Sequence, residues 1–486
     1  MSSNTIKFFK GISTQTIITF AMGVMEIVVF AIISRLLSKE DFGYYAAISG
    51  IIAIFLSISE AGLGASIIQK KDASNTFVST AFAWSLIIGS IISIIVFILA
   101  PTLANIIADS KLIIPLRAMS ITIILHSIIS VGNGILYRKL SFKTVGLISI
   151  ISYFTASAVS IIMASMGLGL YAVIALPITN AIIHSCFLFY IVKFPKLQIQ
   201  PNETKEIVSF GGWLTIGVIL NNISNQLDKL VLSKWLSVEA LGAYNRPAGF
   251  ISSINTKIHN IFDTVLFPML SNIQDDKNRI TNVFFRAIAL LNSFSIILAA
   301  IFFFNSELII TIFFGSSWLD IVPVMQVGAI GAIFSIDHRL VDCFFRSLNF
   351  VKLGTQIRFL GAGLMLISIY FGAQYGIIGV AWSILFANVI LVIIKMIALA
   401  IKVKAKITHM FIEWFCAWRS AIIPTIIGCT YLALPHTLES NIIFAIIFGT
   451  VIVIEFAFFP RLVGTEYQSS VYPYVEKIKN RIIGKK

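Results

Sequence analysis

The chain has 486 residues, of which 58% are hydrophobic and only 12% are charged, and its formal net charge is +14. With a mean hydropathy of +0.94, it has too few polar residues to cover the surface of two or three soluble domains. Apolar stretches of about 20 residues, the length that crosses a bilayer core of about 30 Å, follow one another almost to the end of the chain. The sequence therefore predicts an all-α polytopic membrane protein and excludes an assembly of soluble catalytic domains.

The apolar stretches and the breaker residues between them predict about fourteen transmembrane helices. Twelve are expected at 13–34, 42–66, 77–101, 112–136, 143–166, 169–193, 209–233, 241–268, 283–304, 320–345, 355–373 and 376–401, and a last pair at 416–435 and 441–460. The predicted parts are an N-terminal six-helix bundle over 1–193, a cytoplasmic linker over 194–208 where a hinge or tether would be, a C-terminal six-helix bundle over 209–402, an additional helix pair within 403–460 and a basic cytoplasmic tail over 461–486.

The basic residues of the loops predict the orientation. With the N-terminus inside, one side of the membrane holds nearly all loop lysines and arginines, and the other holds only Arg35, Lys39, Lys111 and Lys234. Cytoplasmic loops carry an excess of Lys and Arg, so both termini are expected in the cytoplasm. The positive net charge then reflects topology and contact with anionic membrane lipids, and no nucleic acid partner is expected.

Two short motifs occur once in each half of the chain. RLLSKEDFGYY at Arg35–Tyr45 is echoed about 200 residues later by KWLSVEALGAY at Lys234–Tyr244, with Leu, Ser, Glu, Gly and Tyr at matching positions. GLGLYAV at Gly167–Val173 and QYGIIGV at Gln374–Val380 each predict a tight glycine turn between an outgoing and a returning helix. These repeats favour two six-helix bundles with inverted or pseudo-symmetric architecture.

Polar side chains inside the predicted helices are the candidate functional residues. In the seventh helix, Asn221, Asn225 and Asp228 are spaced by four and three, so they share one helical face, and Lys229 lies beside them. Lipid cannot satisfy such groups, so they must face protein or water. Two interpretations stay open, a hydrogen-bonded stripe between helices and the lining of a hydrated pathway.

Further charges lie inside other predicted helices. An unpaired cation there costs about 3 kcal/mol on insertion scales, so each either pairs with a carboxylate or faces a cavity. Arginine binds phosphate with a planar bidentate fork, so cations near the membrane centre suit an anionic passenger. The candidate substrate pathway therefore comprises Asn221, Asn225, Asp228, Lys229, Arg246, Lys257, Arg339, Glu26, Glu60 and Arg117.

The sequence contains none of the enzyme motifs that we sought. A P-loop, GxSxG and HExxH are all absent, and the six histidines are scattered. The four cysteines fall in or beside apolar stretches without CxxC or Cys/His spacing, so we expect no metal site. We therefore expect a protein that is not an enzyme and needs no cofactor.

Several segments resemble a known family. RLLSKEDFGYYAA, its echo SNQLDKLVLSKWLSVEALGAYNRPAG, FFGSSWLDIVPVMQVGAI and YGIIGVAWS are similar to Wzx-type polysaccharide flippases of the multidrug/oligosaccharidyl-lipid/polysaccharide exporter superfamily. The resemblance implies a bacterial cytoplasmic-membrane transporter that moves an undecaprenyl-diphosphate-linked oligosaccharide, such as an O-antigen, capsule or exopolysaccharide repeat unit, to the outer leaflet. It also implies a V-shaped pair of six-helix bundles, as in drug exporters of the superfamily, that works by alternating access.

The resemblance leaves the partners and two other functions open. H+ or Na+ could couple transport, and polysaccharide polymerase machinery could receive the product. A multidrug or cation antiporter of the same superfamily would favour acidic cavity residues, whereas this chain has charges of both signs. A membrane-embedded polysaccharide polymerase would need a large external loop, whereas every predicted external loop is short.

Overall fold

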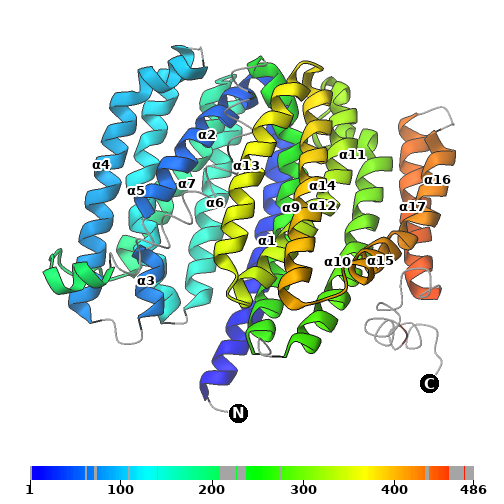
Figure 1. The fold of residues 1–486 in the computed structure, drawn as a ribbon. Helices are drawn as coiled ribbons and strands as arrows, with labels where there is room; N and C mark the ends of the chain where they lie inside the picture. The colour runs from blue at the N-terminus through cyan, green and yellow to red at the C-terminus, as the bar shows by residue number, and fades with distance from the viewer. Residues whose placement is uncertain are drawn as a thin grey trace. The chain divides into compact units, whose positions relative to one another are not determined.

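The computed structural model describes the chain outside residues 1–2, 61–62, 71–73, 108–109, 140, 208–225, 227–231, 233–236, 273–275, 433–436, 459–475 and 477–486 (Figure 1). Side chains at some further positions, including 3–17 and 257–265, also lie outside the description. The helices form two compact units, Met1–Gly242 and Ala243–Lys486.

The first unit is built from long helices that pack in sequence-adjacent pairs. Helix α4 packs along α5 and α6 along α7, and α5 also contacts α7. The short helix α3 lies against α4 and α5. The bounds are α1 (Ser3–Leu36), α2 (Lys39–Glu60), α3 (Leu63–Gln69), α4 (Asn75–Ile107), α5 (Ile113–Arg138), α6 (Phe142–Ser165) and α7 (Leu170–Ile191).

The second unit has helix α12 in contact with both α10 and α14, and α13 packs along α14. Helix α15 follows α14, and α16 and α17 pack against each other. The bounds are α9 (Val238–Asn272), α10 (Lys277–Phe304), α11 (Ser306–Phe313), α12 (Val322–Ser347), α13 (Val351–Ala373), α14 (Gly376–Val403), α15 (Ile407–Cys416), α16 (Ile422–Leu432) and α17 (Leu438–Phe458).

Ten helices among the described residues are long and apolar enough to cross a membrane. They are α1, α2, α4, α5, α6, α7, α10, α12, α13 and α14, which match ten of the predicted transmembrane helices in place and order. The predicted eighth helix lies within α9, and the last pair corresponds to the shorter apolar helices α16 and α17. The predicted seventh helix, 209–233, lies almost entirely outside the described residues. The chain is thus an all-α, multi-pass membrane protein.

The second predicted helix, 42–66, corresponds to α2, which ends at Glu60, and to α3, which begins at Leu63, with residues 61–62 outside the description. Gly64 lies so close to α5 that a Cβ atom on it would be 2.6 Å from the carbonyl oxygen of Ser130. A glycine is needed there because only backbone without a side chain can approach another helix this closely.

The predicted glycine turns are confirmed. Gly167 and Gly169 between α6 and α7, and Gly376 at the first position of α14, have positive φ angles of 76°, 49° and 71°. L-residues with a side chain rarely adopt this conformation, whereas glycine adopts it freely. Each turn joins two helices that pack against each other.

The two copies of the longer repeated motif each start a helix through a serine cap. The Oγ of Ser38 accepts a hydrogen bond from the Asp41 amide at 3.2 Å, and the Oγ of Ser237 accepts one from the Ala240 amide at 3.1 Å. A serine at this position satisfies a backbone N–H that the helix itself leaves without a partner. The shared Leu-Ser pattern therefore sets the starts of α2 and α9.

The matching glycines of the two copies meet inside the first unit. A Cβ atom on Gly43 would lie 1.8 Å from the Val238 carbonyl oxygen, and one on Gly242 would lie 1.9 Å from the Lys39 carbonyl oxygen. Neither position can hold a side chain without moving backbone. The crossing of α2 with the start of α9 is therefore a backbone-to-backbone contact.

We predict that Gly242→Ala lowers the thermal stability of the detergent-purified protein, because the added methyl group must push two backbones apart. Overpacking of this kind costs about 1–3 kcal/mol. The control is Gly249→Ala on the same helix, where a Cβ atom meets nothing within 4 Å. Alanine is the better helix former, so this variant should keep or raise the melting temperature in a fluorescence-detected size-exclusion assay. Equal melting temperatures for both variants would contradict the close crossing.

Candidate functional site

A group of charged side chains lies between helices α12, α13 and α14 of the second unit, centred on Asp342. The ammonium Nζ of Lys395 lies 2.5 Å from Asp342 Oδ1, and Arg358 Nη2 lies 3.4 Å from Asp342 Oδ2. The three residues come from three different helices. One carboxylate thus bridges two cations across the helix packing of this unit.

His338 belongs to the same group because it precedes Asp342 by four residues, about one helical turn, on α12. Its Nε2 lies 3.0 Å from Lys395 Nζ. A lysine ammonium has only donors, so Nε2 accepts and the ring proton is on Nδ1. Nδ1 is buried and has no hydrogen-bond partner among the described residues. Lys395 is therefore held by two acceptors from one face of α12.

The group runs from a fully buried end to a more open end. The side chain of Lys395 is 0% exposed, that of Asp342 is 18% exposed and that of Arg358 is 32% exposed. An ion pair this deeply buried is roughly neutral for stability as a whole, but removal of one partner leaves a buried charge uncompensated. Lys395 and Asp342 therefore depend on each other, whereas Arg358 is the member that a ligand could reach.

Arg339, a predicted pathway residue, adds a third cation next to this group. It is half-buried on α12, and its Nη2 donates a hydrogen bond to Thr256 Oγ1 of α9 at 3.1 Å. Among the described side chains, Lys395, Arg358 and Arg339 are set against Asp342 and the fully buried Asp337, so cations outnumber carboxylates. Such an excess of positive charge attracts anions, and the arginine guanidinium is suited to binding phosphate.

The group lies toward the end of the unit where α12 and α14 finish and α13 begins. Asp342 precedes the end of α12 at Ser347 by about 8 Å along the helix axis, and Lys395 precedes the end of α14 at Val403 by about 12 Å. The predicted topology makes this the cytoplasmic side.

The predicted residues of the first unit lie on three different helices. Glu26 is half-buried on α1, and Glu60 is half-buried at the last position of α2. Arg117 is exposed on α5, where its guanidinium carbon lies 5.0 Å from the centre of the Phe97 ring of α4. The pathway role of these three residues stays a prediction.

Of the remaining predicted residues, only Arg246 has a described side chain, which is half-buried on α9. Lys257 belongs to α9, but its side chain lies outside the described residues, as do Asn221, Asn225, Asp228 and Lys229. Their role also stays a prediction.

Sequence reasoning missed Lys395 and placed Arg358 only among the loop cations. The sequence did contain a signal for Lys395, because this lysine lies inside the helix with the highest mean hydropathy, 2.8, among the ten candidate spans. A charge in so apolar a helix usually marks a partner or a pathway. Its partners are on another helix, 53 and 57 residues away along the chain, and no sequence pattern shows such a pairing.

Asp337 lies near this group but has a structural contact. It is fully buried, and its Oδ2 accepts a hydrogen bond from the indole Nε1 of Trp414 at 2.8 Å. Trp414 is on α15, which leads from α14 toward the last helix pair. This hydrogen bond therefore fixes α15 against α12.

Comparisons with known proteins place these features in context. A family described as "Polysaccharide biosynthesis protein" matches residues 32–323. The chain is 23% identical to the lipopolysaccharide biosynthesis protein WzxC of Escherichia coli, with 80% of each chain covered. It is 24% identical to the succinoglycan biosynthesis transport protein ExoT of Rhizobium meliloti, with 63% of this chain and 62% of that protein covered.

Solved structures show the same fold at low identity. The lipid II flippase MurJ in its inward closed conformation is 17% identical, with a TM-score of 0.69, and the match covers 96% of this chain and 99% of MurJ. An inward-facing multidrug-resistance MATE transporter is 12% identical, with a TM-score of 0.66 and coverage of 80% and 98%. The fold is therefore of the MurJ and MATE type.

We predict that Lys395→Met destabilises the purified protein by about 3–5 kcal/mol, because Asp342 is left as a buried charge without its main partner. The double variant Lys395→Met/Asp342→Asn should recover most of the loss, since neither charge remains. Lys402→Met, at an exposed position of the same helix, is the control and should change the melting temperature little. Additive losses in the double variant would rule out the coupling.

Proposed function

Because the chain belongs to the polysaccharide biosynthesis protein family, within the Wzx-type flippases, we propose that it moves an undecaprenyl-diphosphate-linked oligosaccharide from the cytoplasmic to the outer leaflet of the bacterial inner membrane. The family match over residues 32–323 is the observation on which this proposal depends. The passenger would be a repeat unit of O-antigen, capsule or exopolysaccharide, and the protein would act as a transporter without covalent chemistry.

The physics of the passenger agrees with the charges of the candidate site. A polyprenyl tail can stay in the bilayer, so only the sugar and diphosphate need a polar route. The free energy needed to move those charges through hydrocarbon unaided is prohibitive. A water-accessible route with cations lowers this free-energy barrier. Arg358, 32% exposed, and the half-buried Arg339 supply cations at the predicted cytoplasmic side, where such a headgroup would enter.

The proposed mechanism is alternating access. Fourteen transmembrane helices would form two six-helix bundles, arranged in a V as in MATE transporters, with the last pair outside them and both termini in the cytoplasm. One bundle would move against the other so that the route opens to each leaflet in turn. The polar face of the predicted seventh helix would line this route, and H+ or Na+ is proposed as a coupling ion.

The alternative within the superfamily is a multidrug antiporter, whose fold this chain shares with a MATE transporter. That similarity, at 12% identity, concerns the fold alone. The excess of cations around Asp342 argues for an anionic passenger, because a cationic drug would be repelled there. Cells that express the chain would then gain no resistance to cationic dyes.

We predict that depletion of the protein in its host makes lipid-linked oligosaccharide accumulate on the cytoplasmic leaflet, because the headgroup cannot cross unaided. The measurement is the fraction of lipid-linked glycan that a membrane-impermeant probe labels in intact cells and in opened membranes. Resistance to cationic dyes that falls on depletion, with glycan distribution unchanged, would favour the drug exporter.

Within the same assay, we predict that Arg339→Ala and Asp228→Ala lower surface glycan about tenfold or more while protein amounts stay normal. Loss of a hydrogen bond to a charged group costs about 1.5–3 kcal/mol, which corresponds to that range. Arg346→Ala, an exposed arginine on the same helix as Arg339, is the control and should leave surface glycan unchanged. Normal glycan in both test variants would give these residues a structural role.

A further inference from the structure

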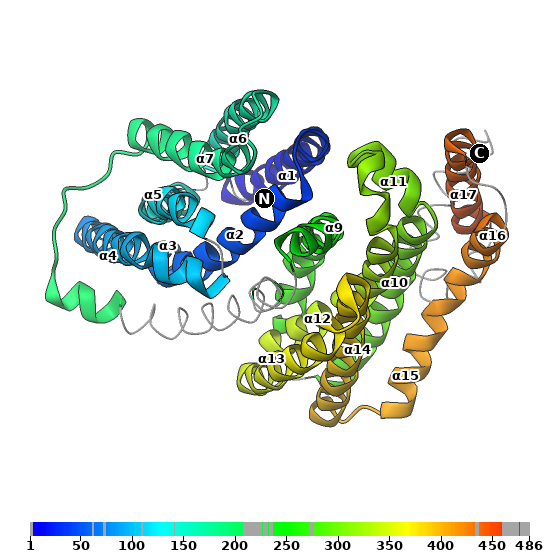
Figure 2. The same ribbon diagram turned by 90° about the horizontal axis from the view of Figure 1, so that it is seen from above.

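The segment that follows α7, residues 194–207, is packed onto the first unit at both of its ends. Figure 2 shows it leaving α7 and passing around the outer side of α4 to a short helix over 201–207. Near its start, the ring of Phe194 stacks on Phe82 of α4 with centroids 4.5 Å apart. At its end, Ile207 is 3% exposed in a hydrophobic cluster with Leu63, Ile67 and other residues of the unit. We call this segment the strap.

Between these ends, backbone and side-chain hydrogen bonds hold the strap along α4. The Gln200 amide donates to Thr80 Oγ1 at 3.2 Å, and the indole Nε1 of Trp84 donates to Thr204 Oγ1 at 3.0 Å. Thr80 and Trp84 are one helical turn apart, so they present two contacts on one face of α4. The contacts at Thr80, Phe82 and Trp84 all lie within about one turn of α4, so the strap is held against this one part of the helix.

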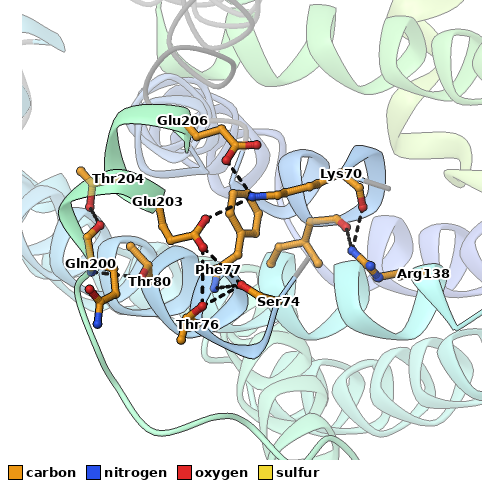
Figure 3. A network of polar contacts seen from close by, with 11 residues as sticks. Lys70, Ser74, Thr76, Phe77, Thr80, Arg138, Gln200, Glu203, Thr204 and Glu206 are labelled. Atoms are coloured by element: carbon orange, nitrogen blue, oxygen red, sulfur yellow. Dashed lines mark hydrogen bonds and ion pairs between the residues drawn. The ribbon is translucent and has the colours of Figure 1, made fainter. Parts of the chain in front are cut away.

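Lys70 joins the strap to the end of α3. Its Nζ lies 3.1 Å from Glu203 Oε2 and 2.7 Å from Glu206 Oε2, and 4.1 Å from the centre of the Phe77 ring (Figure 3). Burial alone would lower the pKa of Lys70, but the hydrogen bonds to Glu206 and Glu203 and the attraction of both carboxylates raise it above the usual lysine value. The ammonium charge is therefore kept at every physiological pH, and it would be lost only as the pH rises through that raised value.

The other side of α3 is held by α5. Nη1 of Arg138 donates to the carbonyl oxygens of Ile67 and Lys70, at 3.2 Å and 2.8 Å (Figure 3). An isolated helix of 7 residues is not stable in water, so the position of α3 depends on such contacts. Strap, α3, α4 and α5 form one connected body around Lys70.

We propose that the strap is a permanent brace of the first unit, and that Lys70 is the positioning residue that fixes both the strap and α3 during transport. The proposal rests on the proposed flippase function. On this proposal residues 194–207 do not act as a hinge, whereas the whole predicted linker over 194–208 had been expected where a hinge or tether would be. The strap would then travel with the first unit through the transport cycle.

A charge-reversal experiment tests the role of Lys70. Lys70→Glu places three carboxylates together, so the backbone amides of Gln200 and of residues 202–207 should exchange with deuterium about tenfold faster than in the unmodified protein. Flipping of lipid-linked oligosaccharide in proteoliposomes should fall by a similar factor. The triple variant Lys70→Glu/Glu203→Lys/Glu206→Lys restores opposite charges and should restore both. Lys139→Glu, an exposed cation near the end of α5, is the matched control. Unchanged exchange in Lys70→Glu, or no rescue by the triple variant, would overturn the positioning role.

A crosslink tests whether the brace is permanent. In a background with the four native cysteines replaced by alanine, Thr80→Cys and Gln200→Cys place thiols at two residues that are joined by a hydrogen bond from the Gln200 backbone amide to the Thr80 side chain. Oxidation should lock the strap to α4 and leave flipping within about twofold of the reduced protein, because the strap never needs to leave. Flipping lost on oxidation and regained on reduction would overturn the proposal. If the reduced protein moves no lipid-linked oligosaccharide, the proposed function fails, while the exchange measurement still decides on the brace.

Discussion

The structure depends on one constraint, that a charge inside an apolar helix must find its partner within the protein. Lipid offers none, so each intramembrane ion determines which helices have to meet. Asp342 shows this most directly, because it ties Lys395 of α14 and Arg358 of α13 to α12. The same constraint acts on Asp337, which is fully buried and accepts a hydrogen bond from Trp414. Hydrophobic contact alone would leave several helix packings equivalent, and the ion pairs determine which of them the protein adopts.

The same contacts separate structural charges from charges that could serve transport. Lys395 is fully buried and contacts Asp342 and His338, so its charge is already paired inside the protein. Arg358 is shared between Asp342 and a more open surface, and Arg339 reaches toward α9. In the proposed transport, rigid pairs would define the shape of the helix bundle, and the accessible cations would meet the passenger.

Hydropathy was sufficient to predict most helices. It did not predict the places where two helices approach each other closely. Ten predicted spans match helices, because the length and composition of a spanning helix are set by the bilayer. The close approach of Gly64 to α5 was not predicted, since a hydropathy pattern does not show which residues of two helices touch. At the candidate site, Arg339 and Asp342 could be found as charges in a span, but the partners of Asp342 are set by packing between helices. A single sequence contains no record of that packing.

The meeting of Gly43 and Gly242 has a consequence for how the two halves of the chain can change. Both residues are already the smallest amino acid, so a mutation that enlarges one cannot be offset by shrinking the other. The contact is also made by main-chain atoms, which leaves the neighbours free to diverge, as Phe42 and Leu241 have done. A duplicated segment can thus lose nearly all similarity between its copies and still keep this one pair of positions fixed.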